Sequence, residues 1–240
     1  MTRSTTSSRL KSAQFIKAVL EFHPKTAVFD CDGTLWAGDA GERFFDWELK
    51  RGLVADDVVR WARARYADYK AGLVDEETMC GEMVTLHKGL LESEVQRAAT
   101  EFFDENFVVQ IFGEMNDLIT QLRATGCDVW AVSSSNEWVI RAGMKHCGIA
   151  QEKILASSVA IENGRITEQL LRVPSGPGKS DAIREVVRKR PDVAFGNARW
   201  DTEMLEMAAH PFVVNPNADL ELTARENDWP IYLPNQAPVR

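Results

Sequence analysis

Four polar segments of this 240-residue chain carry side chains that suit phosphate and metal chemistry. They are Asp30-Cys31-Asp32-Gly33-Thr34, Ser133-Ser134-Ser135-Asn136, Gly178-Lys179-Ser180 and Gly196-Asn197-Ala198-Arg199-Trp200-Asp201. Carboxylate and amide oxygens hold hard divalent cations, and hydroxyl, ammonium and backbone N–H groups hold phosphate oxygens. These segments therefore indicate a site for a divalent cation and a phosphate group, provided that the fold brings them together.

Each polar segment follows a short apolar run or begins a predicted helix. The runs Lys25–Asp30, Cys127–Val132, Val193–Phe195 and Phe212–Val214 are typical of buried parallel strands. Asn163-Gly164 predicts a hairpin turn within Ile154–Ile166. Helical spacing predicts helices at Ala13–Phe22, Met115–Ala124, Glu137–His146, Lys179–Lys189, Thr202–Ala209 and Leu220–Glu226.

The alternation of strands and helices predicts an α/β fold, a Rossmann-like parallel sheet covered by helices on both faces. Residues 37–112 interrupt this alternation with helical spacing and are too long for a simple crossover. We expect a core formed by residues 1–36 and 113–240, with a helical cap domain inserted at 37–112. In such a sheet, ligands bind beyond the carboxyl ends of the strands, where the polar segments would meet.

Composition narrows the possible functions. The chain has 28 Lys+Arg and 36 Asp+Glu, a net charge of −8, and no basic block, which disfavours nucleic-acid binding. No apolar run reaches the roughly 18 residues of a membrane span. Four widely spaced cysteines, with no signal peptide, predict reduced thiols in a cytoplasmic protein. A small molecule is therefore the expected partner, with neither nucleic acid nor membrane.

The four segments, in this order, resemble the motifs of the haloacid dehalogenase superfamily, in its phosphoserine phosphatase-like branch of subfamily IB type. The family's Asp-x-Asp-Gly-Thr motif is met by Asp30–Thr34, its Ser or Thr after an apolar strand by Ser133, its Lys by Lys179, and its last motif by Gly196–Asp201. The resemblance covers Thr26 to about Asn215. It implies a Mg²⁺-dependent hydrolase of a small phosphomonoester that acts through an aspartyl-phosphate intermediate.

The resemblance also implies catalytic and phosphate-binding roles. Asp30 would be the nucleophile, and Asp32 would protonate the leaving alkoxide and then activate water. Ser133, the backbone N–H of Ser134 and Lys179 would bind the phosphoryl oxygens. The second Asp of the first motif favours a phosphatase over a dehalogenase, because a halide leaving group needs no acid.

The metal ligands implied by the resemblance are Asp30, the backbone carbonyl of Asp32, Asn197 and Asp201. The family usually has Asp in place of Asn197. An Asn oxygen can still coordinate the metal, but one negative charge is lost, which favours an active enzyme with altered metal affinity. Two alternatives stay open: a weak or inactive protein that binds a phosphometabolite, and a phosphotransferase.

Candidates for substrate recognition follow the first motif: Trp36, Asp39, Glu42 and Phe45. In the phosphoserine phosphatase-like branch an acidic residue near this position binds the substrate amine, a role open to Asp39 or Glu42. Aromatic rings with a carboxylate could instead hold a choline-type ammonium by cation–π attraction. The leaving group would then be phosphoserine-like or phosphocholine- or phosphoethanolamine-like. The aromatic residues could also serve only to pack the cap onto the core.

Overall fold

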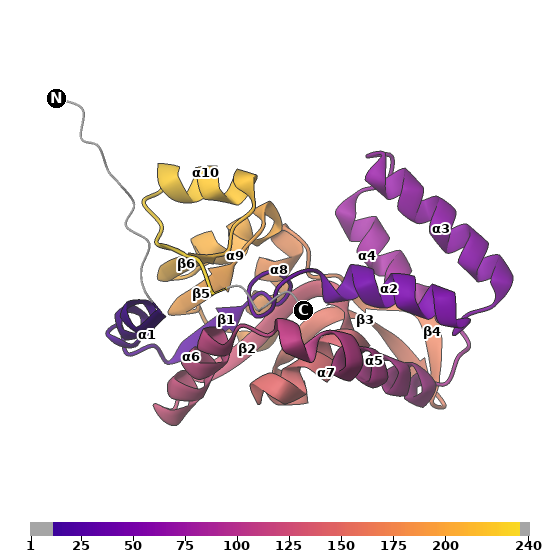
Figure 1. Ribbon diagram of the computed structural model, residues 1–240, viewed down its shortest axis with the longest axis horizontal. Helices are drawn as coiled ribbons and strands as arrows, with labels where there is room; N and C mark the ends of the chain where they lie inside the picture. The colour runs from indigo at the N-terminus through magenta and orange to yellow at the C-terminus, as the bar shows by residue number, and fades with distance from the viewer. Residues whose placement is uncertain (1–11, 236–240) are drawn as a thin grey trace.

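The computed structural model describes residues 12–235 and has a mostly parallel seven-stranded sheet at its centre (Figure 1). The sheet order is β4-β3-β2-β1-β5-β6-β7, and only the β3–β4 hairpin is antiparallel. The bounds are β1 Thr26–Phe29, β2 Asp128–Asn136, β3 Ile154–Glu162, β4 Arg165–Arg172, β5 Val193–Gly196, β6 His210–Val214 and β7 Ile231–Tyr232. The predicted α/β class is confirmed.

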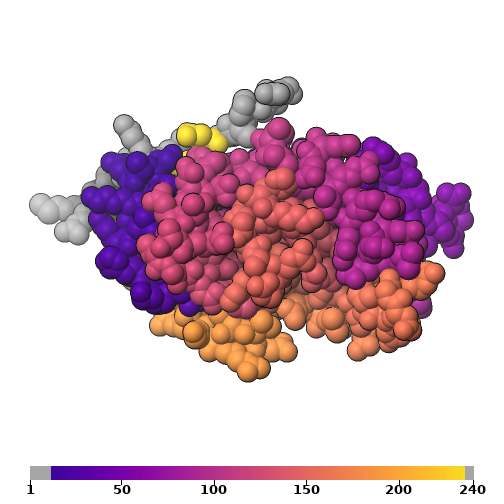
Figure 2. Space-filling view, turned by 90° about the horizontal axis from the view of Figure 1, so that it is seen from below, coloured from indigo at the N-terminus to yellow at the C-terminus, as the bar shows by residue number. Residues whose placement is uncertain are grey.

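Helices cover both faces of this sheet because neighbouring strand residues point to opposite sides. Ala27 and Phe29 face one core with α1 (Ser12–Leu20), α5 (Glu92–Asn106), α6 (Gly113–Ala124) and α7 (Glu137–Cys147). In Figure 2 the residues of these helices form one continuous surface. Val28 faces the other core, with α8 (Pro177–Ala182), the π-helical turn η3 (Ile183–Val187), α9 (Thr202–Met207) and α10 (Ala218–Glu226).

The span that was predicted to be helical contains α2 (Ala40–Arg51), α3 (Asp56–Lys70), α4 (Glu76–Thr85) and α5 (Glu92–Asn106), which we call the cap helices. Short 3₁₀ turns lie at Val108–Gln110, Gln151–Lys153 and Arg199–Asp201. The cap helices α3 and α4 stand beside one end of the sheet in Figure 1, whereas α5 packs against α7. The division into a core and a cap domain stays a prediction, and residues 1–11 and 236–240 of the predicted core lie outside the described range.

Several details differ from the sequence prediction, two of them next to the polar segments. Strand β2 continues to Asn136 instead of ending at Val132, with an irregular register toward β3 after Val132. Helix α8 begins at Pro177 instead of Lys179, since a proline is well suited to the first turn, where its missing N–H is not needed. The Asn163-Gly164 turn is as expected, with positive φ at both residues. None of the described helices is long and apolar enough to cross a membrane.

Candidate active site

The carboxyl ends of β1, β2 and β5 meet at one edge of the sheet and position three of the polar segments. Asp30 follows β1 directly, and its backbone N–H donates to Phe195 O at 2.9 Å. Ser133 lies in β2, Asn197 follows β5, and Lys179 comes from α8. These residues line one cavity of about 320 Å³, together with Asp32, Ser134 and Asp201. The expected convergence of the four segments is therefore present in the structure.

A buried ion network forms the floor of this cavity. Lys179 Nζ donates to Asp30 Oδ1 at 2.6 Å and to Asp201 Oδ1 at 2.5 Å. All three side chains are buried. Although burial lowers the pKa of Lys179, the charges of Asp201 and Asp30 more than offset this and raise it. Lys179 is therefore held as an ammonium between the two carboxylates.

The other oxygen of Asp30 accepts a hydrogen bond from the Thr34 hydroxyl at 2.8 Å. Burial and the charge of Asp201 raise the pKa of Asp30 to about 7, against the opposing effect of Lys179. Two carboxylates thus share a single ammonium in a desolvated place. This leaves an excess of negative charge that a bound cation would neutralise.

The Asp201 carboxylate also orders the loop that carries Asn197. Its Oδ2 accepts hydrogen bonds from the backbone N–H groups of Asn197 at 2.8 Å and Ala198 at 2.9 Å. The Asn197 amide lies directly over Gly33, where a Cβ atom would come within 1.9 Å of Nδ2. Gly33 also has φ +76°, a conformation that glycine adopts without strain. The glycine of the first motif therefore lets the first and last motifs approach each other.

The side chains present fit a hard cation such as Mg²⁺. Asp30, Asn197 and Asp201 line the same cavity and offer oxygens, and the excess negative charge favours a cation. Among residues 12–235, no group of three or more His, Cys, Asp or Glu side chains is arranged to hold a metal. The donor set for a cation would thus depend on the Asn197 amide and the backbone carbonyl of Asp32 as well as on carboxylates.

Asp32 lies apart from the Lys179 network and accepts three hydrogen bonds. Its Oδ1 accepts from Trp36 Nε1 at 2.7 Å and from the backbone N–H of Ala40 at 2.6 Å. Its Oδ2 accepts from Ser135 Oγ at 2.6 Å. Burial and the charge of Asp39 raise the pKa of Asp32 to about 7, although the three hydrogen bonds act to lower it. A carboxyl group that titrates near neutral pH suits proton transfer.

The serine segment differs in one respect from expectation. The serine run is typical of a helix start, where Ser133 would cap the helix and the Ser134 N–H would be free to bind phosphate. Both serines lie instead in β2, and the residue that caps α7 is Asn136, whose side chain accepts from Trp138 N at 2.9 Å. The longer strand brings Ser133, Ser134 and Ser135 along the cavity wall.

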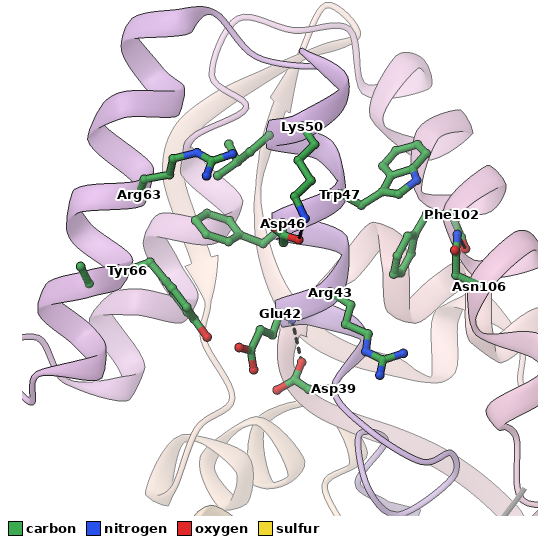
Figure 3. Close-up of a pocket in the computed structure, with 13 residues that line it drawn as sticks. Asp39, Glu42, Arg43, Asp46, Trp47, Lys50, Arg63, Tyr66, Phe102 and Asn106 are labelled. Carbon is green, nitrogen blue, oxygen red and sulfur yellow. Dashed lines mark hydrogen bonds and ion pairs between the residues drawn. The ribbon is translucent and has the colours of Figure 1, made fainter. Parts of the chain in front are cut away.

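The four residues predicted to bind the substrate do not all line the same cavity. Asp39 and Glu42 line a small adjoining cavity of about 140 Å³, and Asp39 also caps α2 by accepting from Glu42 N at 2.7 Å. Phe45 lines only a larger outer cavity of about 850 Å³ between α2, α3 and α5 (Figure 3). Asp39 and Glu42 line this cavity too, and Asp39 also lines the active-site cavity. Trp36 lines none of these cavities; it is fully buried and contacts Asp32 instead.

Other cavity residues were not foreseen from the sequence. Glu76, from α4, lines both the active-site cavity and the small cavity beside it. Tyr66 and Tyr69 of α3 line the small cavity, and the Tyr69 hydroxyl donates to Glu76. The Lys70 ammonium lies 5.0 Å from the Tyr66 ring centre and 3.5 Å from Glu42 Oε1. No spacing in the sequence links these residues to the first motif, since only the packing of α3 and α4 brings them there.

Known proteins are similar to this chain over most of its length. Residues 27–206 match the model of the family described as haloacid dehalogenase-like hydrolase. A histidinol-phosphatase of Neisseria meningitidis is 24% identical over 216 residues, which cover 85% of this chain and 96% of the relative. The phosphoserine phosphatase SerB1 of Mycobacterium tuberculosis is 25% identical over 221 residues, which cover 85% and 69% of the two chains.

Solved structures share the fold. A protein of unknown function from Bordetella pertussis superposes with a TM-score of 0.73 at 19% identity, covering 86% of this chain and 97% of that one. A substrate-bound phosphoserine phosphatase superposes with a TM-score of 0.58 at 16% identity, covering 88% of this chain and 93% of that one.

Proposed function

This chain belongs to the haloacid dehalogenase-like hydrolase family and is a phosphatase, and we propose that it hydrolyses a small phosphomonoester through an aspartyl-phosphate on Asp30. One observation carries this proposal. Lys179 joins Asp30 to Asp201 in a buried network beside Ser133, at the carboxyl ends of the strands. A carboxylate attacks a phosphate ester only where the negative charge of the phosphoryl group is neutralised. The Lys179 ammonium provides part of the positive charge that this requires.

The reaction proceeds in two steps. Asp30 attacks phosphorus, a bond forms between its carboxylate oxygen and phosphorus, and the bond from phosphorus to the leaving oxygen breaks while Asp32 gives that oxygen a proton. Asp32 then takes a proton from water, which attacks phosphorus and releases orthophosphate from Asp30. Ser133 Oγ, the Ser134 N–H and Lys179 hold the phosphoryl oxygens throughout.

Mg²⁺ is the proposed cofactor. Asp30, Asn197, Asp201 and the backbone carbonyl of Asp32 would hold it. When bound, the ion neutralises phosphate charge and orients the ester for attack. Asn197 is the residue that favours the second candidate function, a protein that binds a phosphometabolite without turnover.

The leaving-group side of the site favours an amino alcohol. Asp39, Glu42 and Glu76 meet the rings of Tyr66 and Tyr69 around the small cavity. Desolvation, together with the charges of Glu42 and Glu76, raises the pKa of Asp39 to about 6, as expected where carboxylates lie close together with little positive charge beside them. A substrate ammonium would relieve this crowding and lie against aromatic rings. Phosphoserine, phosphocholine, phosphoethanolamine and histidinol phosphate all carry a cationic or basic leaving group of this kind.

We place this reaction in the cytoplasm, and the free state of all four cysteines supports that choice, because reducing compartments keep thiols unpaired.

The test is phosphate release from a panel of esters, with Mg²⁺ and then with a chelator. The panel contains the four amino-alcohol phosphates, sugar phosphates and p-nitrophenyl phosphate. We expect release that depends on Mg²⁺ and favours cationic leaving groups, and no release by Asp30→Asn. Asp56→Asn, on the exposed start of α3, is the matched control and should behave as wild type.

Three outcomes would contradict parts of the proposal. Turnover that survives in Asp30→Asn would exclude Asp30 as the nucleophile. Tight ester binding without turnover under any metal would favour the binding protein. Phosphate release only when a second alcohol is present, with the phosphoryl group found on that alcohol, would favour a phosphotransferase.

A further inference from the structure

The three donors to Asp32 come from three separate parts of the chain. Trp36 lies in the loop after β1, Ala40 provides the first backbone N–H of α2, and Ser135 lies near the end of β2. The loop, the first cap helix and the central sheet thus all hold one carboxylate. An aspartate side chain has two rotatable bonds, so each donor removes orientations that the free side chain would sample.

Both side-chain donors are fixed by tight packing beside a glycine. The Trp36 ring is fully buried and meets Phe103 of α5 edge-on at 5.1 Å. A Cβ at Gly143 of α7 would lie 2.8 Å from that ring. A Cβ at Gly41 of α2 would lie 2.4 Å from Ser135 Oγ. Each glycine therefore makes room for the donor beside it.

The hydrogen bonds distinguish the two oxygens of Asp32. Oδ1 accepts from an indole N–H and a backbone N–H, which donate only, so both of its in-plane lone pairs are engaged. Oδ2 accepts from one hydroxyl and keeps one lone pair free. Oδ2 is therefore the oxygen of Asp32 that has a lone pair left to carry a proton.

We propose that Ser135 and Trp36 are positioning residues that hold the Asp32 carboxyl with Oδ2 directed to the leaving oxygen. This inference depends on the proposed function, because it needs Asp32 as the acid of the first step. A general acid works only within hydrogen-bond reach of the atom it protonates. Loss of either donor frees the Asp32 carboxyl to rotate. Proton transfer to the leaving oxygen then becomes slower, whereas the affinity for phosphate does not change.

The experiment compares two leaving groups in variants that remove one donor each. Ser135→Ala removes the hydroxyl, and Trp36→Phe removes the indole N–H while retaining an aromatic ring. The substrates are p-nitrophenyl phosphate, whose leaving group departs without an acid, and the alkyl phosphate that the panel identifies as the best substrate. The value compared is kcat/KM, which reports the step that breaks the ester bond.

We expect both variants to lose roughly tenfold or more in kcat/KM on the alkyl ester, since general acids typically contribute about 10²–10⁴-fold. On p-nitrophenyl phosphate the loss should be less than about threefold, because this ester needs little help from an acid. The Ki of inorganic phosphate should stay at its wild-type value in both variants. Ser93→Ala and Trp61→Phe, at exposed positions on α5 and α3, are the matched controls and should show no loss on either ester.

Three results would overturn the inference: an equal loss on both esters, a weaker binding of inorganic phosphate, or no loss on the alkyl ester. The first indicates a general structural defect and the second a direct contact with the phosphoryl group. If Trp36→Phe fails to fold, Ser135→Ala decides alone, because Ser135 lines the cavity and is only half-buried. Inactivity of the wild type toward every ester would refute the proposed function itself, before any variant is measured.

Discussion

At the scale of single residues, the negative charges around Lys179 outnumber its one positive charge. Asp30 and Asp201 both bind its ammonium, and no second ammonium or guanidinium among residues 12–235 forms an ion pair with either carboxylate. The resemblance to the family implies that one further carboxylate has become the Asn197 amide. An amide retains an oxygen ligand and lowers the local negative charge, so the change should act mainly on metal affinity.

Asn197→Asp should therefore strengthen Mg²⁺ binding, by roughly tenfold, because a carboxylate adds charge to an oxygen ligand set. Two measurements check this: the Mg²⁺ concentration that gives half-maximal phosphate release, and the rise in Tm with added Mg²⁺, which needs no activity. Asn227→Asp, at an exposed helix end, is the control and should leave both unchanged. An unaltered Mg²⁺ requirement in Asn197→Asp would show that residue 197 does not contact the metal.

The pKa of Asp30 predicts how stability depends on pH. Burial and the charge of Asp201 raise this pKa from 3.8 to about 7. Because the folded value exceeds the unfolded one, ionisation of Asp30 destabilises the fold. This loss of folding stability is absent below pH about 4, grows as the pH rises, and is complete above pH about 7.

Asp30→Asn removes this destabilisation. The free energy of unfolding of the variant, minus that of wild type, should therefore increase as the pH is raised from 4 to 8. The gain is at most about 4 kcal/mol, from about 1.4 kcal/mol for each pKa unit. Urea unfolding of both proteins at several pH values, with a chelator present, measures it. A difference between the two proteins that does not change with pH would contradict the raised pKa.

The sequence was informative for residues that the sheet itself brings together. Asp30, Ser133, Lys179 and Asp201 were all expected at one edge, because parallel strands end there. Ser135 and Trp36 were not recognised as partners of Asp32. Ser135 is 103 residues away in sequence, and both contacts depend on space left by Gly41 and Gly143, which no local pattern reveals.

At the scale of elements, helices were predicted better than their connections. Amphipathic spacing located α1, α6, α7 and α10 to within a few residues, since one face of each helix must be buried. Strand β7 was missed because two residues are too few to show alternation. The end of β2 was misplaced because Ser-Ser-Ser-Asn is typical of a loop or helix start, and tertiary pairing with β3 overrides that preference.

A buried polar pair connects two cap helices. Glu48 of α2 lies 2.6 Å from Nε2 of His87, which follows α4, and both side chains are almost fully buried. His87 Nδ1 donates to the Val84 carbonyl at 3.1 Å, so Nε2 depends on Glu48 for its partner. Burial raises the pKa of Glu48, whereas His87 opposes the rise. The pair therefore joins α2 to the segment that follows α4.

Glu48→Ala should lower the free energy of unfolding by about 3 kcal/mol, because it leaves the His87 ring buried without its partner. Chemical denaturation measures this loss. Glu226→Ala, at the exposed end of α10, is the matched control and should change stability by less than about 0.5 kcal/mol. A loss in Glu48→Ala as small as that of the control would mean that the pair does not hold the two helices together.

At the scale of the whole molecule, the cap helices are attached unequally. Helix α5 contributes Val95, Phe102 and Phe103 to the main core, beside α7. Helix α3 buries only Ala62, which belongs to a separate small cluster with residues of α2 and α4. The outer cavity lies between these two unequal parts, and Tyr66 of α3 lines both this cavity and the small one. Local opening of α3 would therefore expose the leaving-group side of the site and leave the Asp30 network intact.

Amide hydrogen exchange in the full chain tests this order of stability. The amides of α3 should exchange much faster than those of α5, because local opening costs least where few apolar side chains are buried. Helix α7, which packs on both α5 and the sheet, is the internal reference and should be as protected as α5. If α3 exchanged as slowly as α5, the cap helices would open only together, and opening of α3 alone could not admit substrate.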